Sequence, residues 1–484
     1  MPEMSPNDSE PPESGTEHGV RDTSAESSGG SLLRDPRHRV AIIALAGVLA
    51  LDGADRTALG ALAPALKTQF GIGNGDIGLL ASAFAIVGAL ATIPIGILTD
   101  RVNRITILVV SIGIWCAAMG VAAAAATFAV LFVARITLGV LSAAGEPPVS
   151  SIVGDFFPAD TRGRVLGLIE SGQLVGAGIG FIVAGVVLWF TSWRGVFVVL
   201  ALIGVGVGFI VSRVPEPRRG GDVDVREGDE VGKEEPTQLA QLVAEEDVEP
   251  VDDLVLEGDQ SEVPIVPAVE YVFRVRTVVT TIVAGALSDF FFVALQVFGV
   301  LYLVEQFDIS VTSASLLIPL VGVGGFVGVI AGGHVGDALI GRGVLTGRLH
   351  VGIWSFLIAA ILMLPVFLVS SLAVAVPFLV LACAFLAAPV APLDAARLDA
   401  VHPQLRGRAE GTRVIVRVAA QATAPLLFAF LADELGGGGA DGLRLAFLSL
   451  LPLLGASSFV LMIGARHYPS EVAAVEASEV ADDA

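Results

Sequence analysis

The sequence has few of the residues on which metal centres and cross-linked folds depend. Its 484 residues include only two cysteines and six histidines. Cys116 and Cys383 fall in two different apolar stretches, so a disulfide framework is not expected. The histidines lie in polar segments or at the ends of apolar stretches, without the spacing of metal ligands. We therefore predict no metal centre and no cofactor.

Nucleotide-binding motifs are missing as well. Gly-x-Gly runs such as "GVGVG" at 204–208 fall inside apolar stretches. Small residues in that setting are typical of close helix packing and not of phosphate loops. We therefore do not expect an enzyme.

Lysine is almost absent. The chain has 28 basic residues, of which only Lys67 and Lys233 are lysines, against 49 acidic residues and a formal net charge of −21. Sixteen carboxylates lie between Asp222 and Glu262 alone. Acidic blocks of this kind are usually solvated and repel nucleic acid, so no nucleic-acid partner is expected. Acidic, lysine-poor polar segments also suit a high-salt cytoplasm, which predicts a halophile.

Apolar surface is what the sequence has in abundance. Hydrophobic residues make up 54% of the chain, with 56 glycines and a mean hydropathy of +0.78. About 20 apolar residues cross the hydrocarbon core of a bilayer. The pattern predicts an all-α polytopic membrane protein with twelve spanning helices, over residues 40–66, 77–98, 105–126, 128–153, 165–190, 193–213, 277–304, 309–334, 349–370, 372–393, 410–432 and 444–465.

Arginine is distributed unevenly over the segments between these helices. Fifteen arginines fall in the tails, the linker ends and the loops on the same side, whereas the other loops hold only Lys67, Arg194 and Arg444. Basic residues stay on the cytoplasmic side of membrane proteins. We therefore expect a multi-pass protein of the plasma membrane whose termini are both cytoplasmic.

Charge and hydropathy divide the chain into five segments. An apolar island in the acidic linker, "QLAQLVAE" at 238–245, could form a short docking helix, but a disordered tether is expected there. The segments are a disordered acidic tail (1–39), an N-terminal six-helix bundle (40–213), the acidic linker (214–275), a C-terminal six-helix bundle (276–467) and a second acidic tail (468–484).

Two motifs of the first bundle recur in the second. "GILTDRVNR" at 96–104 is matched by "GHVGDALIGR" at 333–342, and "DFFPADTRGR" at 155–164 by "DAVHPQLRGR" at 399–408. The last two stretches share the spacing from aspartate to RGR and lie 244 residues apart. The sequence therefore predicts two six-helix halves related by an internal repeat.

This organisation resembles the major facilitator superfamily, whose loop between helices 2 and 3 carries a "GxxxDRxxR" motif; Asn103 stands here where glycine is usual. Further stretches resemble helices 1, 5 and 11 of its Spinster-like group: "LDGADRTALGALAPAL" (51–66), "SGQLVGAGIGFIVAGV" (171–186) and "ATAPLLFAFLAD" (422–433). The resemblance implies two six-helix bundles that rock around a central cavity. Spinster-like proteins are linked to lysolipids and sphingoid lipids.

Several ionisable residues lie inside predicted helices, where each costs about 2.5–3.5 kcal/mol and needs a partner or a function. Asp52 and Arg56 are four residues apart and can pair on one helix face, which leaves Asp55 to find another partner. Arg135 and Asp289 lie at a depth similar to that of Asp55, and the resemblance puts their helices around one cavity. We expect one site, with Asp55 and Asp289 in proton coupling and Asp52, Arg56 and Arg135 in substrate binding. Structural ion pairs are the alternative interpretation.

Glu146 is the third candidate for proton coupling. It lies eleven residues after Arg135, on nearly the same helical stripe, directly before Pro147 and Pro148, which should open the helix. Spinster-like proteins usually carry a glutamate seven residues after this arginine, where the chain has Ser142. Either Glu146 keeps that role from a shifted position, or the proton takes a different route.

Charged residues at the predicted cytoplasmic helix ends are expected to form a gate that closes only in the outward-facing state. Single exposed pairs contribute little, but a network closed in only one state biases a two-state equilibrium. Structural support alone is the alternative. The predicted gate residues are Gly96, Asp100, Arg101, Arg104, Asp155, Arg162 and Arg164 in the first half, and Asp337, Arg342, Asp399 and Arg406 in the second.

These features together predict an alternating-access secondary transporter of an amphiphilic or lipid-like organic solute. Protons are the expected coupling ion, with sodium as the alternative, and we expect a monomer in the lipid bilayer. A multidrug or small-molecule efflux antiporter is the first rival, although the Gly-Pro pair that such antiporters usually carry in helix 5 is absent from this chain. A non-transporting membrane sensor, whose linker binds a partner, is the rival of another class.

Overall fold

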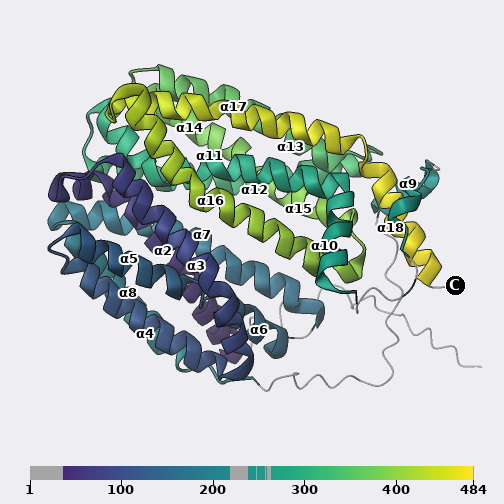
Figure 1. Cartoon of the computed structure of the whole chain (residues 1–484), viewed down its shortest axis with the longest axis horizontal. Helices are drawn as coiled ribbons and strands as arrows, with labels where there is room; N and C mark the ends of the chain where they lie inside the picture. The colour runs from purple at the N-terminus through teal and green to yellow at the C-terminus, as the bar shows by residue number, and fades with distance from the viewer. Residues whose placement is uncertain are drawn as a thin grey trace, which may run out of the picture.

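The structure is a computed structural model that describes residues 36–157, 159–217, 238–246, 248–256, 258 and 263–482, and all regular elements within them are helices. Figure 1 shows two bundles lying side by side, the N-terminal one in purple to teal and the C-terminal one in green to yellow. Eleven helices of the described part are long and apolar enough to cross a membrane. The further long helix is α2 (Pro36–Phe70), whose apolar run is interrupted by Asp52, Asp55 and Arg56. The predicted all-α polytopic fold is confirmed.

The helices follow the predicted spans closely. After α2, the N-terminal bundle contains α3 (Asn74–Arg101), α4 (Arg104–Ala123), α5 (Phe128–Ser142), α6 (Glu146–Phe156), α7 (Ala159–Phe190) and α8 (Trp193–Val211). The C-terminal bundle contains α11 (Arg276–Phe307), α12 (Val311–Ile340), α13 (Gly347–Leu368), α14 (Leu372–Ala387), α15 (Val390–Asp399), the 3₁₀ turn η2 (Pro403–Leu405), α16 (Arg406–Gly436) and α17 (Ala440–Ala465).

Each half has one spanning segment that is broken at the same point of the repeat. α5 ends at Ser142 and α6 begins at Glu146, with prolines in the first turn that cannot donate backbone hydrogen bonds. In the second half α14 ends at Ala387 and α15 begins at Val390, which is 244 residues after Glu146 (390 minus 146). The prediction that the prolines open this helix is confirmed.

Glycines set how closely α2 and α7 pack. A Cβ on Gly176 would lie 2.0 Å from the carbonyl oxygen of Ala50, and one on Gly172 would lie 2.3 Å from that of Ala46. Only glycine allows the two backbones to approach so closely. This packing carries Gln173 of α7 to within hydrogen-bond distance of Asp52.

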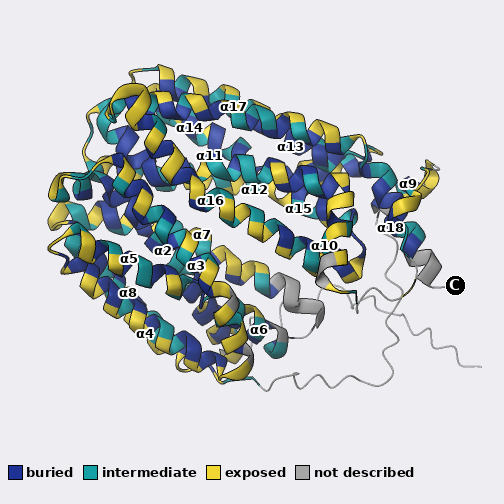
Figure 2. Ribbon diagram, viewed as in Figure 1, coloured by how far each residue is buried: buried dark blue, intermediate teal, exposed yellow. Residues whose placement is uncertain are grey.

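Figure 2 shows buried and exposed residues alternating along the helices of both bundles, and many of the exposed residues are large and apolar. Large aliphatic side chains such as Leu90 and Ile415 are more than two-thirds exposed. Exposed apolar surface on this scale would be unfavourable in water and matches the lipid-facing surface of a membrane protein.

The two halves meet closely at the end of the bundles opposite the linker, here called the opposite face; the other end is the linker face. Lys67 Nζ lies 3.1 Å from Glu305 Oε1 across the halves, and Asn74 Nδ2 donates to Asp433 Oδ1 at 3.0 Å. A Cβ on Gly60 would lie 2.4 Å from the carbonyl oxygen of Gln296. The described contacts therefore close the opposite face.

Parts of the linker and the C-terminal segment are folded. The linker contains α9 (Gln238–Glu245), the 3₁₀ turn η1 (Asp252–Leu254) and α10 (Ile265–Arg274), and the chain continues after α17 into α18 (Tyr468–Asp482). Figure 1 shows α9 beside α18. The expectation of a disordered tether is wrong for 238–245, because Leu239 and Val243 bury one apolar face of the helix. Of the predicted disordered tail 1–39, residues 1–35 lie outside the described part and the remainder begins α2.

Candidate functional site

A buried ion pair joins α2 and α5 in the N-terminal half. Arg135 Nη1 donates to Asp55 Oδ1 at 2.5 Å, and each side chain is 1% exposed. The guanidinium also lies 4.6 Å from the ring centroid of Phe84. Among the described residues, Asp55 Oδ2 and Arg135 Nε have no hydrogen-bond partner. The pair is held by one hydrogen bond, which leaves the second carboxylate oxygen able to accept a proton.

A second ion pair lies one turn away on α2. Arg56 Nε donates to Asp52 Oδ2 at 2.7 Å, and the Arg56 side chain is 36% exposed. Gln173 Nε2 donates to the same carboxylate oxygen at 3.1 Å. Asp52 therefore has a second donor besides Arg56. The sequence interpretation overlooked Gln173, although a polar residue within the apolar span 165–190 was the available signal.

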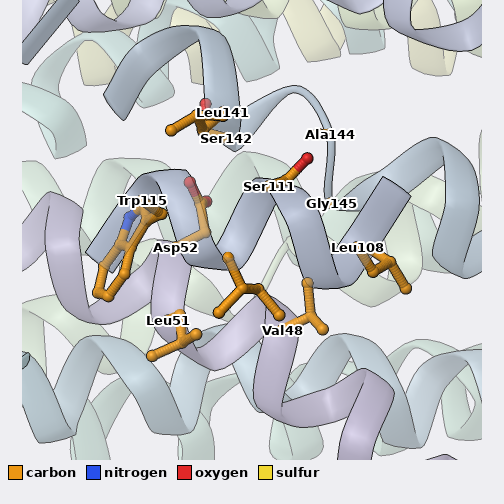
Figure 3. A pocket seen from close by; sticks show the side chains of 11 residues that line it. Val48, Leu51, Asp52, Leu108, Ser111, Trp115, Leu141, Ser142, Ala144 and Gly145 are labelled. Carbon is orange, nitrogen blue, oxygen red and sulfur yellow. The ribbon is translucent and has the colours of Figure 1, made fainter. Parts of the chain in front are cut away.

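A small cavity of about 40 Å³ lies between α2, α4 and α5 (Figure 3). Its polar lining residues are Asp52, Ser111 and Ser142, and the buried Asp52 Oδ1 has no hydrogen-bond partner among the described residues. A water molecule needs about 10–15 Å³ of such space, so the cavity can hold water next to the carboxylate. Its lining residues are Val48, Leu51, Asp52, Leu108, Ser111, Ile112, Trp115, Leu141, Ser142, Ala144 and Gly145.

Glu146 lies at the break between α5 and α6 and is exposed. It interacts electrostatically with Arg56, and also with Glu170 of α7. Glu170 in turn interacts with Glu410 and Arg413 of the second half. The structure thus gathers acidic side chains from both halves on the linker side of the two ion pairs. Glu170 was not predicted from the sequence, where it stands near the polar end of an apolar span.

Asp289 occupies a different cluster from Asp55. Its Oδ2 lies 3.2 Å from Nε of Arg417, and Arg413 donates to Glu410 one turn earlier on α16. The expectation of one site formed by Asp55, Arg135 and Asp289 is therefore corrected to two ion-pair clusters. Asp289 does not join the Asp55–Arg135 pair, although the three residues were expected at a similar depth. It pairs instead with Arg417 on α16, a helix of its own half.

Arg104 is the centre of the charged network on the linker face of the first half. Its side chain is 1% exposed and donates to Asp155, to Ser151 Oγ at 2.9 Å, to Glu216 Oε1 at 2.9 Å and to the carbonyl oxygen of Pro217 at 2.9 Å. One buried guanidinium thus ties the start of α4 to the end of α6 and to the segment after α8.

Glu216 stands five residues after Val211, the last residue of α8, and was not predicted. It accepts hydrogen bonds from the backbone amides of Arg104 and Ile105 at the start of α4. Burial raises the pKa of Glu216, but the hydrogen bonds from these amides and from the Arg104 guanidinium outweigh burial and hold that pKa below its ordinary value.

The second half repeats this network with one correction. Arg348, and not the predicted Arg342, donates to Asp399 and lies 3.6 Å from Asp337. Arg348 and Asp399 stand 244 residues after Arg104 and Asp155, whereas Arg342 is exposed in the loop after α12. The likeness of "GHVGDALIGR" to "GILTDRVNR" led to the wrong arginine, because the second half has a longer loop between Asp337 and the arginine near the start of the next helix.

The remaining predicted gate residues differ in their surroundings. Arg406 Nε donates to the carbonyl oxygen of Leu398 at 3.2 Å, and Arg101 is exposed in the last turn of α3. Gly96 has open space around it. The side chains of Asp100, Arg162 and Arg164 lie outside the described part of the structure. Within the described residues, no three histidine, cysteine, aspartate or glutamate side chains are arranged to hold a metal ion.

The sequence of this two-bundle protein matches the profile of a known protein family. The sequence profile of the Major Facilitator Superfamily matches residues 45–387, well over half of the chain. The chain belongs to the major facilitator superfamily. Its members are transporters of small organic molecules and not enzymes, so this protein is a multi-pass membrane transporter.

Two superfamily relatives show which branches the chain is similar to. The hexuronate transporter of Bacillus subtilis (strain 168) is 26% identical over 400 residues, which cover 81% of this chain and 87% of that protein. Protein spinster of Drosophila melanogaster is 26% identical over 167 residues, which cover 34% of this chain and 28% of that protein. The chain is thus similar both to a Spinster protein and to a sugar-acid transporter of the superfamily.

The superfamily fold is also shown by a solved structure. A crystal structure of a bacterial homologue of the human lysosomal transporter Spinster, in an inward-facing and unoccupied conformation, matches with a TM-score of 0.72 and 19% identity. The match covers 90% of this chain and 98% of the other. At this identity the likeness establishes the fold, and the predicted superfamily membership is confirmed.

Proposed function

We propose that the protein is a proton-coupled, alternating-access transporter of an anionic amphiphilic or lipid-like solute. Asp55 carries or gates the coupling proton, with Arg135 as its partner. Arg56 anchors the negatively charged head group of the solute. The observation that carries this proposal is the buried, singly bonded Asp55–Arg135 pair beside the Arg56–Asp52 pair, in which Arg56 is partly exposed.

The coupling role rests on how the Asp55–Arg135 pair is held. Both partners are almost fully buried, yet they share a single hydrogen bond, and Asp55 Oδ2 has no partner among the described residues. A buried carboxylate beside an arginine holds its proton more tightly once the arginine moves away. The ring face of Phe84 already contacts the Arg135 guanidinium and would still stabilise this cation if it moved away from Asp55. A small displacement of Arg135 would therefore change the protonation of Asp55.

The substrate role of Arg56 rests on exposure and on an exchangeable partner. Of the two arginines in this site Arg56 is the exposed one, and its partner Asp52 also accepts from Gln173. When a substrate anion takes the guanidinium, Asp52 keeps a hydrogen-bond donor and is not left unpaired. Guanidinium groups recognise carboxylates and phosphates through paired hydrogen bonds. We propose that Glu146, which interacts with Arg56, passes the proton towards the linker face.

Sugar-acid transport is a second candidate, favoured by a relative that the chain covers over most of its length. The hexuronate transporter is named for a carboxylate sugar, and the chain spans 87% of its length. A carboxylate could bind Arg56 as well as a lipid head group could. The two candidates therefore differ in the apolar part of the solute and not in the anchor.

A binding comparison separates these candidates. Thermal unfolding of purified protein would be measured with an anionic lysophospholipid, with glucuronate and with an uncharged alkyl glucoside, for wild type and Arg56→Gln. We expect the lysophospholipid to raise Tm in the wild type and to lose most of its effect in Arg56→Gln. Stabilisation by glucuronate alone would support the second candidate, and an equal effect of the uncharged glucoside on both proteins would contradict the anionic anchor.

We propose the predicted topology and segment boundaries as the working arrangement in the membrane. Both termini and the linker lie in the cytoplasm, and the linker face is the cytoplasmic face. The closed opposite face then corresponds to an inward-facing state. We propose a monomer in the plasma membrane, since Asp55, Asp52 and Asp289 each find an arginine partner within one chain.

A further inference from the structure

The C-terminal helix α18 makes two specific polar contacts with the second bundle. Tyr468, fully buried, donates from its hydroxyl to Asp399 Oδ2 at 2.6 Å. Glu471, 3% exposed, accepts from the backbone amides of Arg276 at 2.7 Å and Thr277 at 2.9 Å. These amides open α11, and a carboxylate on a helix N-terminus is stabilised by the free N–H groups and the helix dipole.

The same helix holds part of the linker. The Leu256 amide donates to Ser478 Oγ at 2.9 Å, and apolar side chains of both segments are buried, including Leu254 of η1 and Val472 and Val475 of α18. A merely solvated tail would bury no apolar face. We call α9, η1 and α18 together the terminal cap (238–245, 252–254 and 468–482).

The contacts of α18 involve a predicted gate residue and a helix that reaches the other half. Asp399 is the partner of Arg348 in the linker-face network. Glu471 binds the backbone amides of the first two residues of α11, the helix that carries Asp289. The same helix reaches the opposite face, where Glu305 pairs with Lys67 of the first half. One short helix therefore fixes a predicted gate residue and the start of a helix that contacts the other half.

The first half places a comparable group on its own network. Glu216, five residues after the last helix of that half, binds Arg104, which pairs with Asp155. Tyr468, directly after the last helix of the second half, binds Asp399, the repeat equivalent of Asp155. In both halves the segment that follows the sixth spanning helix returns to complete the charged network, with a carboxylate in one and a phenol in the other.

We propose that the terminal cap sets the conformational equilibrium of the transporter, with Tyr468 and Glu471 as positioning residues. Docked α18 holds Asp399 against Arg348 and the start of α11 in the arrangement of this state. Loosening either contact shifts the population towards the alternative state. The inference rests on the alternating-access mechanism proposed above.

The test measures populations in a cysteine-free background, with Cys116 and Cys383 replaced by serine. Spin labels at Ser212 and Arg342, both exposed on the linker face of different halves, report the distance between the halves. The full-length protein would be compared with Tyr468→Phe and Glu471→Gln. Tyr302→Phe is the matched control, since its buried hydroxyl donates to the carbonyl oxygen of Val366 away from the linker face. Loss of a hydrogen bond present in one state only should change the ratio of the two distance populations by about fivefold.

The outcomes separate this inference from the proposed mechanism. We expect Tyr468→Phe and Glu471→Gln to shift the populations while Tyr302→Phe leaves them unchanged. Two wild-type populations that respond equally to all three changes, or to none, would overturn the positioning role. A single wild-type distance, unchanged by an imposed pH gradient, would instead overturn alternating access itself. Far-ultraviolet circular dichroism and size-exclusion elution check that each conservative variant is folded.

Discussion

Arg104 and Arg348 occupy equivalent positions of the repeat, but the structure predicts that replacing them by lysine has unequal costs. The Arg104 side chain is 1% exposed, and its three nitrogen atoms donate hydrogen bonds to four different residues. The Arg348 side chain is 19% exposed, and its nearest nitrogen atom lies 3.6 Å from the carboxylate of Asp337. Lysine keeps the charge but concentrates its donors on one atom. A lysine at position 104 or 348 can keep the ion pair with Asp155 or Asp399, respectively. It cannot reproduce the forked arrangement of donors in the guanidinium group.

The magnitude follows from the contacts that are lost. In Arg104→Lys the ammonium group keeps Asp155, and the hydrogen bonds to Glu216 and to the Pro217 carbonyl are both lost. Hydrogen bonds to charged groups contribute about 1.5–3 kcal/mol each, so losing two costs about 3–6 kcal/mol. Arg348→Lys retains its main contact with Asp399 and should cost about 1–2 kcal/mol.

Thermal unfolding of the two purified variants in the same detergent measures this difference. The decrease in Tm should be at least twice as large for Arg104→Lys as for Arg348→Lys. Arg274→Lys, whose partner Glu270 is also exposed, is the control and should leave Tm unchanged. Equal decreases in Tm at the two repeat positions would refute the reasoning from burial and hydrogen-bond number.

Three further predictions test other parts of the structure. Because folding lowers the pKa of Glu216, this carboxylate stabilises the fold at pH values above its pKa in the unfolded chain, and the stabilisation is lost as pH falls through its pKa in the folded protein. The Tm difference between wild type and Glu216→Gln should therefore be largest near neutral pH and vanish in acid. A difference in Tm that does not change with pH would contradict this prediction. Gly60→Ala places a Cβ 2.4 Å from the Gln296 carbonyl oxygen and should open the opposite face, seen as faster labelling of a cysteine at the buried Ala63, whereas Gly113→Ala, which meets no atom within 4 Å, should not; equal labelling rates in both variants would count against the close approach. For the topology, an impermeant thiol reagent applied to intact cells should label a cysteine at Gly437 and miss one at Gly232, and the reverse pattern would overturn the orientation.

The sequence predicted the features that hydropathy and short spacing determine. Twelve spans, the break before Pro147 and the repeat offset all follow from local composition, since a membrane helix must satisfy its backbone within itself. The pairing of Arg56 with Asp52 follows equally from helix geometry, because four residues return the chain to the same face. Partners on one helix need no knowledge of packing.

Partners on different helices were harder to predict. Depth along the helix suggested both Arg135 and Asp289 as neighbours of Asp55, but which side chains meet depends on how each helix is rotated, and sequence spacing does not give that rotation. Asp289 therefore found Arg417. The choice of Arg342 over Arg348 had another cause: the motif was matched by likeness, while the offset of 244 residues would have given the correct arginine.

The folded linker and tail were missed for a compositional reason. Their acidic residues dominate the local charge, so α9 and α18 read as solvated segments. Their apolar residues recur at helical spacing, however, and a docking surface on another segment stabilises a helix that could not fold alone. Glu216 and Tyr468 were missed because each contributes a single polar group just after a spanning helix, where no pattern distinguishes it.

The central claim is that Asp55 couples proton movement to transport. The competing view is a permanent structural ion pair with Arg135, in which case removing one partner costs about 3–5 kcal/mol and Asp55→Asn with Arg135→Gln restores the Tm that Asp55→Asn loses. Gradient-driven uptake and substrate exchange would be measured in proteoliposomes, for wild type, Asp55→Asn and the exposed control Asp441→Asn, with the anion that stabilises the purified protein. We predict that Asp55→Asn remains folded and exchanges substrate but no longer responds to an imposed pH gradient, while Asp441→Asn behaves as the wild type. Accumulation by folded Asp55→Asn at the wild-type rate under a pH gradient would contradict the claim.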